Sequence, residues 1–155
     1  MANAFTQIYI HVVFVVHGRQ NLIPSKKKDE LFKYIAGIIN EKGHKTFIVN
    51  GMQDHLHILL GYNPIEGLSA LVKELKRCSS MYINKYNWVK GKFEWQSGYG
   101  GFSFSKSQID AVYKYIQNQE KHHKTKTFRE EYVELLKKIE VEYDERYIFE
   151  EVVLP

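Results

Sequence analysis

The sequence has only one cysteine, Cys78, among its 155 residues. A single cysteine cannot form an intramolecular disulfide, and it excludes a zinc site built from several cysteines. Chains without disulfides are typical of reducing compartments, so we expect a cytoplasmic location. Cys78 itself is expected to be a small apolar residue within a helix.

Long apolar stretches are also absent. No run of about 18 apolar residues could span a bilayer, and the N-terminal residues Met1 to Gln7 show no basic region followed by an apolar core. The sequence contains no internal repeat, low-complexity tract or linker. We therefore expect a soluble, unsecreted protein with no membrane partner. Its single domain should span residues 1–155, with an acidic tail from about residue 139.

Aromatic residues and positive charge are well represented. Apolar residues make up 44% of the chain and aromatic residues 14%, which is enough for one core and leaves some aromatic side chains for stacking on bases. The formal charge is +4 and the isoelectric point is about 9.0. This excess favours polyanionic partners such as nucleic acid but does not by itself identify one.

The order of periodic segments predicts an α+β domain. Strands are indicated by runs rich in β-branched and aromatic residues, and helices by apolar residues at i, i+3, i+4 and i+7. We predict strands over 8–16, 46–49 and 55–60, extended pieces over 93–95 and 101–104, and helices from Lys26–Lys28 to Gly43 and over 67–86, 105–122 and 127–138. A tight turn is predicted at Asn50-Gly51. We expect an antiparallel sheet with helices on one face, as in ferredoxin-like or RNA-recognition-motif-like folds.

His55-Leu56-His57 is the first motif that indicates chemistry. Side chains alternate along a strand, so both imidazoles project from one face and can share a metal ion, while Leu56 turns to the other face. Asp54 or Gln53 is expected to supply a further oxygen ligand or to support a histidine. The alternative is that the two histidines are only polar residues on the solvated face of a half-buried strand.

The second motif lies in the predicted helix over 105–122. Tyr115 and Gln119 are four residues apart, so a hydroxyl nucleophile and an amide oxygen would share one helix face. A tyrosine can attack a phosphodiester and keep the broken strand as a phosphotyrosine ester, but its pKa of about 10 means that a nearby cation must assist. Tyr113 is predicted to lie on the apolar stripe and to pack in the core. The alternative for Tyr115 is a packing role at the helix edge.

Together, these motifs resemble those of the insertion-sequence-200-type transposases. These enzymes are the smallest single-tyrosine members of the histidine-hydrophobe-histidine superfamily of single-strand DNA nucleases. The resemblance covers nearly the whole chain, in the same order and at similar spacing. The segments that carry it are 9–14, 52–59, 71–80, 95–99, 115–120 with His122-His123, and 128–131.

The resemblance implies a transposase that nicks and rejoins single-stranded DNA at hairpin-marked element ends. His55 and His57 would be metal ligands, Gln119 would complete the site, and Tyr115 would become linked to the 5′ phosphate. Mg²⁺ or Mn²⁺ suits two neutral imidazoles and an amide oxygen. A homodimer joined edge to edge is expected, with the first strand at the edge and the tyrosine helix able to complete the partner's site. When bound to DNA, the protein would be associated with the nucleoid.

Several basic and aromatic residues are predicted to contact DNA. The candidates for phosphate contact are Lys26, Lys27, Lys28, Lys73, Lys76 and Arg77, and those for base stacking are Tyr99, Phe102 and Trp95. Lysine runs are also common at solvated helix starts, and Trp95 would fit a core equally well. The run Lys121 to Lys124 is expected to provide positive charge at a helix C-terminus, because adjacent helical residues diverge by about 100°.

Three other functions fit parts of the sequence. One is a domesticated relative of the transposases with another role. Another is a nucleic-acid-binding module without catalysis, which would need aromatic residues where His55 and His57 stand. The third is a metal hydrolase in which water attacks, and for such an enzyme Tyr115→Phe would leave activity largely intact.

Overall fold

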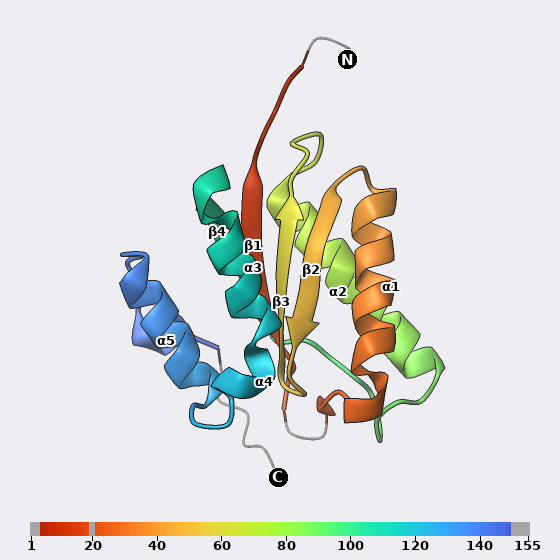
Figure 1. Cartoon of the computed structure of the whole chain (residues 1–155). Helices are drawn as coiled ribbons and strands as arrows, with labels where there is room; N and C mark the ends of the chain where they lie inside the picture. Colours follow the sequence, from red (N-terminus) through yellow and green to blue (C-terminus); the bar gives the residue numbers. More distant parts are fainter. Residues whose placement is uncertain (1–3, 19–20, 150–155) are drawn as a thin grey trace.

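Four strands form one antiparallel sheet in the computed structural model, which describes residues 4–18 and 21–149 (Figure 1). They are β1 (Tyr9–Val15), β2 (Lys45–Gly51), β3 (His55–Gly61) and β4 (Gly100–Phe104), in the order β2-β3-β1-β4. The predicted α+β class and ferredoxin-like sheet are confirmed. The prediction of an edge position for the first strand is wrong, because β1 pairs with both β3 and β4.

The helices occupy the segments expected from their apolar periodicity. They are α1 (Lys28–Glu41), α2 (Leu68–Lys85), α3 (Ile109–Gln117), α4 (Gln119–His122) and α5 (Phe128–Lys138), with 3-10 turns η2 (Ser25–Lys27), η3 (Lys106–Gln108) and η4 (Glu145–Tyr147). Among the described residues, none of the helices is long and apolar enough to cross a bilayer. The extended piece predicted over 93–95 is reduced to a bridge between Val16 and Trp95.

Helices cover both faces of the sheet rather than one. Val12, Phe14 and Ile58 point to the face that packs against α1 and α2. On the opposite face, Val13 packs against α5, and Leu59 packs against α3. Figure 1 shows α1 and α2 on one side of the strands and α3 and α5 on the other. The histidine pair of β3 therefore lies under a layer of helices.

The turn between β2 and β3 lies two residues later than predicted. Asn50 and Gly51 are the last residues of β2, where they pair with His57 and Leu56, and the turn spans 52–54. Gly51 approaches the partner strand so closely that an added Cβ would collide with the carbonyl oxygen of His55. The glycine is needed for this close strand approach and not for a tight turn.

The helix predicted over 105–122 is interrupted at Asn118. Ser105 and Gln108 form a capping box at its start, with the Ser105 amide donating to Gln108 Oε1 at 2.9 Å. At the interruption, Asn50 Nδ2 donates to the carbonyls of Ile116 (2.9 Å) and Gln117 (3.2 Å). These bonds satisfy carbonyls at the end of α3, so the chain can turn before α4 begins.

The close approach at Gly51 predicts a loss of stability in Gly51→Ala. The new methyl group must push β3 away, so the free energy of unfolding should fall by about 1–3 kcal/mol. Gly37→Ala is the control, because this exposed position inside α1 has no atom within 4 Å of an added Cβ and should become more stable by about 1 kcal/mol. Urea unfolding measures both. Equal stability of Gly51→Ala and the unmodified protein would contradict the steric explanation.

Candidate metal and tyrosine site

Strand alternation places His55 and His57 on the face of β3 that α3, α4 and α5 cover. Both side chains have no exposed surface. The Nδ1 atom of His55 lies 2.7 Å from Asp54 Oδ1, and the Nδ1 atom of His57 lies 2.8 Å from Nε2 of His11 on β1. Each ring is thus fixed from behind, and both Nε2 atoms face the same space. Asp54 therefore supports the His55 ring, which is one of the two roles predicted for Asp54 or Gln53.

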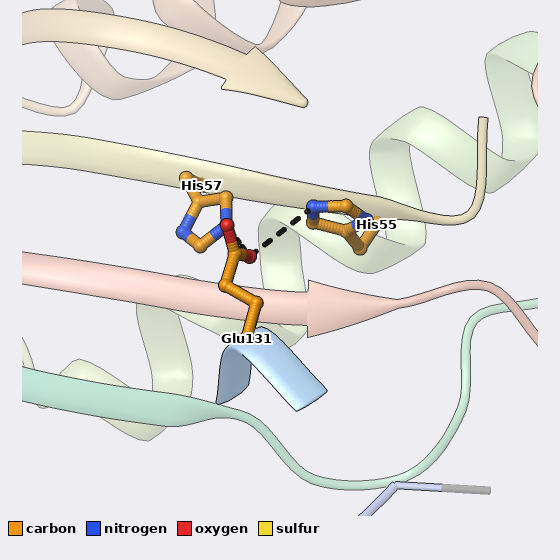
Figure 2. A group of neighbouring side chains, drawn as sticks. All are labelled: His55, His57 and Glu131. Carbon is orange, nitrogen blue, oxygen red and sulfur yellow. Dashed lines mark hydrogen bonds and ion pairs between the residues drawn. The ribbon is translucent and has the colours of Figure 1, made fainter. Parts of the chain in front are cut away.

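Glu131 on α5 enters this space between the two histidines. Its Oε1 atom lies 3.1 Å from His57 Nε2 and 3.8 Å from His55 Nε2. Figure 2 shows the Glu131 carboxylate pointing toward the two imidazole rings. The ligand atoms of these three residues all lie within 4.8 Å of one another. Ligands of an octahedral ion at about 2.1 Å are about 3 Å apart, so this spacing fits one cation.

Gln119 lies at the same place, as predicted, although α4 and not α3 carries it. Its Oε1 atom is 2.9 Å from His55 Nε2, and its Nε2 atom donates to Glu131 Oε2 at 3.1 Å. The side chain is completely buried. Two imidazoles, one carboxylate and one amide oxygen form a donor set that divalent metal ions accept.

The protonation of the ligands also fits a cation. Burial lowers the pKa of His57, so its imidazole is neutral at pH 7. Burial alone would raise the pKa of Glu131, but hydrogen bonds from His123 and His57 outweigh it and hold the pKa far below its usual range. The carboxylate is therefore ionised. A neutral imidazole and an anionic carboxylate are the forms that bind metal.

Tyr115 faces the same site from α3. Its ring lies 5.7 Å from that of His57, centre to centre, within one chain. The hydroxyl is buried and makes no hydrogen bond of ordinary geometry with the described residues. Burial raises the pKa of Tyr115, and the Glu131 carboxylate raises it further. Tyr113, which was predicted to pack in the core, is instead 37% exposed. The preference for Tyr115 over Tyr113 therefore fits the geometry, and of the residues assigned to the apolar stripe only Tyr113 is placed wrongly, since Val112 and Ile116 are buried.

The sequence analysis did not place Glu131, or His122 and His123 at the end of α4, at this site. Glu131 is an acidic residue on the buried stripe of α5, between Phe128 and Tyr132, and this misplaced charge was a signal that could have found it. His123 Nε2 lies 3.3 Å from Glu131 Oε2, and the ring of His122 lies 5.1 Å from that of Tyr115. His122 ends α4 and His123 follows it, and both lie at the site, while the expectation that this run provides helix-end charge stays a prediction.

A cavity of about 400 Å³ opens beside Tyr115, between α3 and α5. It is lined by His11, Phe104, Gln108, Ala111, Val112, Tyr115, His122, Lys126, Glu131, Glu134, Leu135, Lys138 and Ile139. Its charged lining residues are the basic Lys126 and Lys138 and the acidic Glu131 and Glu134, of which Lys126 pairs with Glu134. A phosphate group of a nucleic acid has a size that such a space accepts.

The basic residues of α2 that were predicted to contact DNA differ in the contacts that they make within the protein. Lys76 Nζ donates to the carbonyls of Gln96 (2.8 Å) and Gly98 (2.5 Å), and burial lowers its pKa to about 8. Arg77 pairs with Glu74. Lys76 therefore anchors the loop after Trp95, whereas Lys73 is exposed on the same helix.

The predicted stacking residues are less accessible than expected. Phe102 is only 9% exposed because it packs against Tyr132, so it is a core residue and not a stacking surface. The Tyr99 hydroxyl lies 2.7 Å from Ser69 Oγ, and Trp95 donates to Ser79 Oγ at 2.9 Å.

The lysine run at the start of α1 stays on the surface. Lys27 pairs with Glu30 at 3.6 Å, and Lys28 pairs with Glu120 on α4 at 3.4 Å. Lys26 and Lys27 are exposed, so they can reach a phosphate without disturbing the core.

Known proteins share both the sequence pattern and the fold. Residues 4–119 match the family described as "Transposase IS200 like". The ISDra2 transposase TnpA of Deinococcus radiodurans is 26% identical over 119 residues, which are 73% of this chain and 84% of that protein. The family match ends at Gln119, so Glu131 and α5 lie beyond the matched residues.

Two solved structures have a similar fold. One is described as a candidate transposase from Deinococcus radiodurans R1, with a TM-score of 0.58 and 22% identity, and covers 76% of this chain and 94% of its own. The other is a REP-associated tyrosine transposase bound to a REP hairpin, with a TM-score of 0.59 and 10% identity over 78% of this chain and 72% of its own. Because the family match extends over about three quarters of the chain, this protein belongs to the family of IS200-like transposases.

Proposed function

We propose that this transposase nicks and rejoins single-stranded DNA at hairpin-marked element ends, through a 5′-phosphotyrosine formed on Tyr115. The observation that carries the proposal is the convergence of His55, His57 and Glu131 within 4.8 Å, with Tyr115 beside them. The similarity in fold to a tyrosine transposase bound to a REP hairpin supports hairpin DNA as the partner.

His55, His57 and Glu131 would hold a divalent cation, with Gln119 as a further ligand. Mg²⁺ or Mn²⁺ bound there would withdraw negative charge from a non-bridging oxygen of the scissile phosphate. The carboxylate favours these oxygen-preferring ions more strongly than the predicted set of two histidines and Gln119 alone.

Tyr115 supplies the nucleophile. Its Oη atom forms the new bond to phosphorus, the bond to the 3′ oxygen breaks, and the phenol proton leaves while the 3′ oxygen gains one. The DNA end stays attached by its 5′ phosphate, so the bond energy is conserved and a 3′ hydroxyl can later reverse the step. Burial, and after it the Glu131 carboxylate, raise the pKa of Tyr115, so the phenol is protonated before DNA binds.

A dimer joined through its sheets would use β2 or β4, since β1 and β3 are internal. Within one chain, Tyr115 already lies next to His57. In a homodimer in which α3 completes the partner's site, Tyr115 would lie next to His57 of the partner subunit. That contact would replace the one that Tyr115 makes with His57 of its own chain. The cytoplasm, with attachment to the nucleoid on DNA binding, is the proposed location.

The sheet geometry does not favour the binding-module alternative. RNA-recognition domains present aromatic side chains on an open sheet face. Here that face carries His11, His55 and His57 and is covered by α3, α4 and α5. A domesticated relative that is still active would keep the same site and would form a covalent adduct with DNA, whereas an inactive relative would form none.

The first prediction concerns the nucleophile. Wild-type protein incubated with Mn²⁺ and a labelled hairpin oligonucleotide from the flanking DNA should form an adduct that survives denaturation. Tyr115→Phe should abolish the adduct because it removes the attacking oxygen, whereas Tyr113→Phe, a change on the exposed side of the same helix, should keep it. Denaturing gel electrophoresis detects the adduct. Cleavage that persists in Tyr115→Phe would instead identify water as the nucleophile.

The second prediction concerns Glu131. Glu131→Gln keeps the shape of the side chain but removes its charge, so the affinity for Mn²⁺ should fall about 10- to 100-fold. Glu134→Gln is the matched control on the same helix, because its carboxylate pairs with exposed Lys126. Calorimetric titration with Mn²⁺ measures the change. If both variants bind Mn²⁺ as the wild type does, Glu131 is not a ligand.

A third prediction separates Lys73 from Lys76. Lys73→Gln removes an exposed charge, so hairpin affinity should fall and the slope of log K against log salt should decrease by about 0.7. Lys76→Gln should mainly lower the free energy of unfolding, since it releases the carbonyls of Gln96 and Gly98. DNA titrations at several salt concentrations, with urea unfolding, test both. An unchanged salt slope in Lys73→Gln would remove it from the DNA surface.

A further inference from the structure

His11 is the buried histidine of β1 that the proposed mechanism does not use. Its side chain is 1% exposed, and its ring stacks on that of His57 with centres 5.0 Å apart. His11 Nε2 lies 2.8 Å from His57 Nδ1. The chain Glu131, His57, His11 is therefore a continuous series of hydrogen-bonding groups that begins at the proposed cation site.

Without a cation, the carboxylate sets the direction of these bonds. Ionised Glu131 can only accept, so His57 must donate from Nε2 at 3.1 Å. A neutral His57 then has a lone pair on Nδ1, and His11 must donate to it from Nε2. His11 is 1% exposed and forms no ion pair with a carboxylate among the described residues, so its buried ring is also neutral. Its Nδ1 atom consequently carries no proton.

Both tautomers would reverse if His57 held a cation through Nε2. A metal ligand needs a lone pair on the ligating nitrogen, so the proton of His57 would lie on Nδ1 and would be donated to His11. His11 Nε2 becomes the acceptor, and the single proton of the neutral His11 ring then lies on Nδ1. The number of protons on the two rings is unchanged. Only the hydrogen-bonding character of His11 Nδ1 differs between the two states.

His11 Nδ1 has no hydrogen-bond partner among the residues that the structure describes. His11 contributes to the wall of the 400 Å³ cavity that Tyr115 also lines, and the two rings are 6.2 Å apart in an edge-to-face arrangement. An unpaired buried N–H is unfavourable, and an incoming acceptor would remove that cost. The atom is covered in this conformation, so an acceptor must displace part of the helical layer.

We infer that His11 is a positioning residue that couples cation binding at His57 to binding of the scissile phosphate in the cavity beside Tyr115. With the cation bound, His11 Nδ1–H donates to a non-bridging phosphate oxygen. Without it, the same nitrogen presents a lone pair, which repels that oxygen. The inference rests on the proposed function, because that function supplies the phosphate. By reciprocity, DNA must strengthen cation binding by the same factor.

Nitrogen-15 NMR of the histidine rings tests the tautomer change without DNA. Zn²⁺ is a suitable diamagnetic probe because it binds imidazole well. His11 should carry its proton on Nε2 in the metal-free protein and on Nδ1 after saturation with Zn²⁺. The same tautomer in both states would overturn the inference. Since no DNA is cleaved in this measurement, its result is independent of the phosphotyrosine mechanism.

Binding measurements test the coupling. In a Tyr115→Phe background, which leaves the DNA intact, Mg²⁺ should raise the affinity for the hairpin oligonucleotide. His11→Gln keeps an acceptor near His57 Nδ1 but removes the ring nitrogen that is proposed to donate to the phosphate. We expect the affinity for Mg²⁺ alone to stay within about threefold, while the Mg²⁺-dependent gain in DNA affinity falls about tenfold.

His44→Gln is the matched control. His44 is also buried and makes a hydrogen bond of the same length, 2.8 Å to Glu66, but it lies outside the site. This variant should keep the full Mg²⁺-dependent gain even if the free energy of unfolding falls. An equal gain in His11→Gln and the unmodified background would overturn the coupling, as would the absence of any gain in that background.

Discussion

The Glu131 carboxylate joins three separate pieces of the chain at one point. It accepts from Gln119 on α4 and lies against His57 on β3 and against His123, and its own backbone belongs to α5. A buried charge is stable only when it is paired and hydrogen-bonded, so each of these contacts depends on the others. This network adds to the apolar contacts of Phe128, Tyr132 and Leu136 that hold α5 over the sheet. A cation would replace the imidazole protons as the partner of the same carboxylate.

Features that follow from side-chain periodicity could be predicted from the sequence. The period of two in β3 places His55 and His57 on one face, and the helical period gives α1, α2 and α5 close to their observed bounds. These patterns are local, because each depends only on burying one face of an element. The fold class followed from the order of such elements, and the family match agrees with it.

Predictions failed where a distant residue decides the local structure. Asn50 interrupts the helix after Tyr115 by binding its terminal carbonyls, although 66 positions separate Asn50 from Ile116. Gly51 looks like a turn residue, but its role is fixed by His55 on the next strand. Lys76 appears in the sequence as a basic residue for DNA, yet it anchors loop carbonyls. No window of neighbouring residues contains this information.

The break at Asn118 means that the nucleophile and an expected cation ligand belong to different rigid pieces. Tyr115 lies on α3, whereas Gln119 begins α4, and the backbone between them is already non-helical at Asn118. Moving α3 would break the two Asn50 hydrogen bonds, at about 1 kcal/mol each, and would separate Val112 and Ile116 from Leu59, but it would not require unwinding a continuous helix. A DNA end attached to Tyr115 could thus be carried away from the sheet while Gln119 remains with His55. The strand β2 takes no part in the chemistry, but its Asn50 would restrain that movement through the hydrogen bonds to α3.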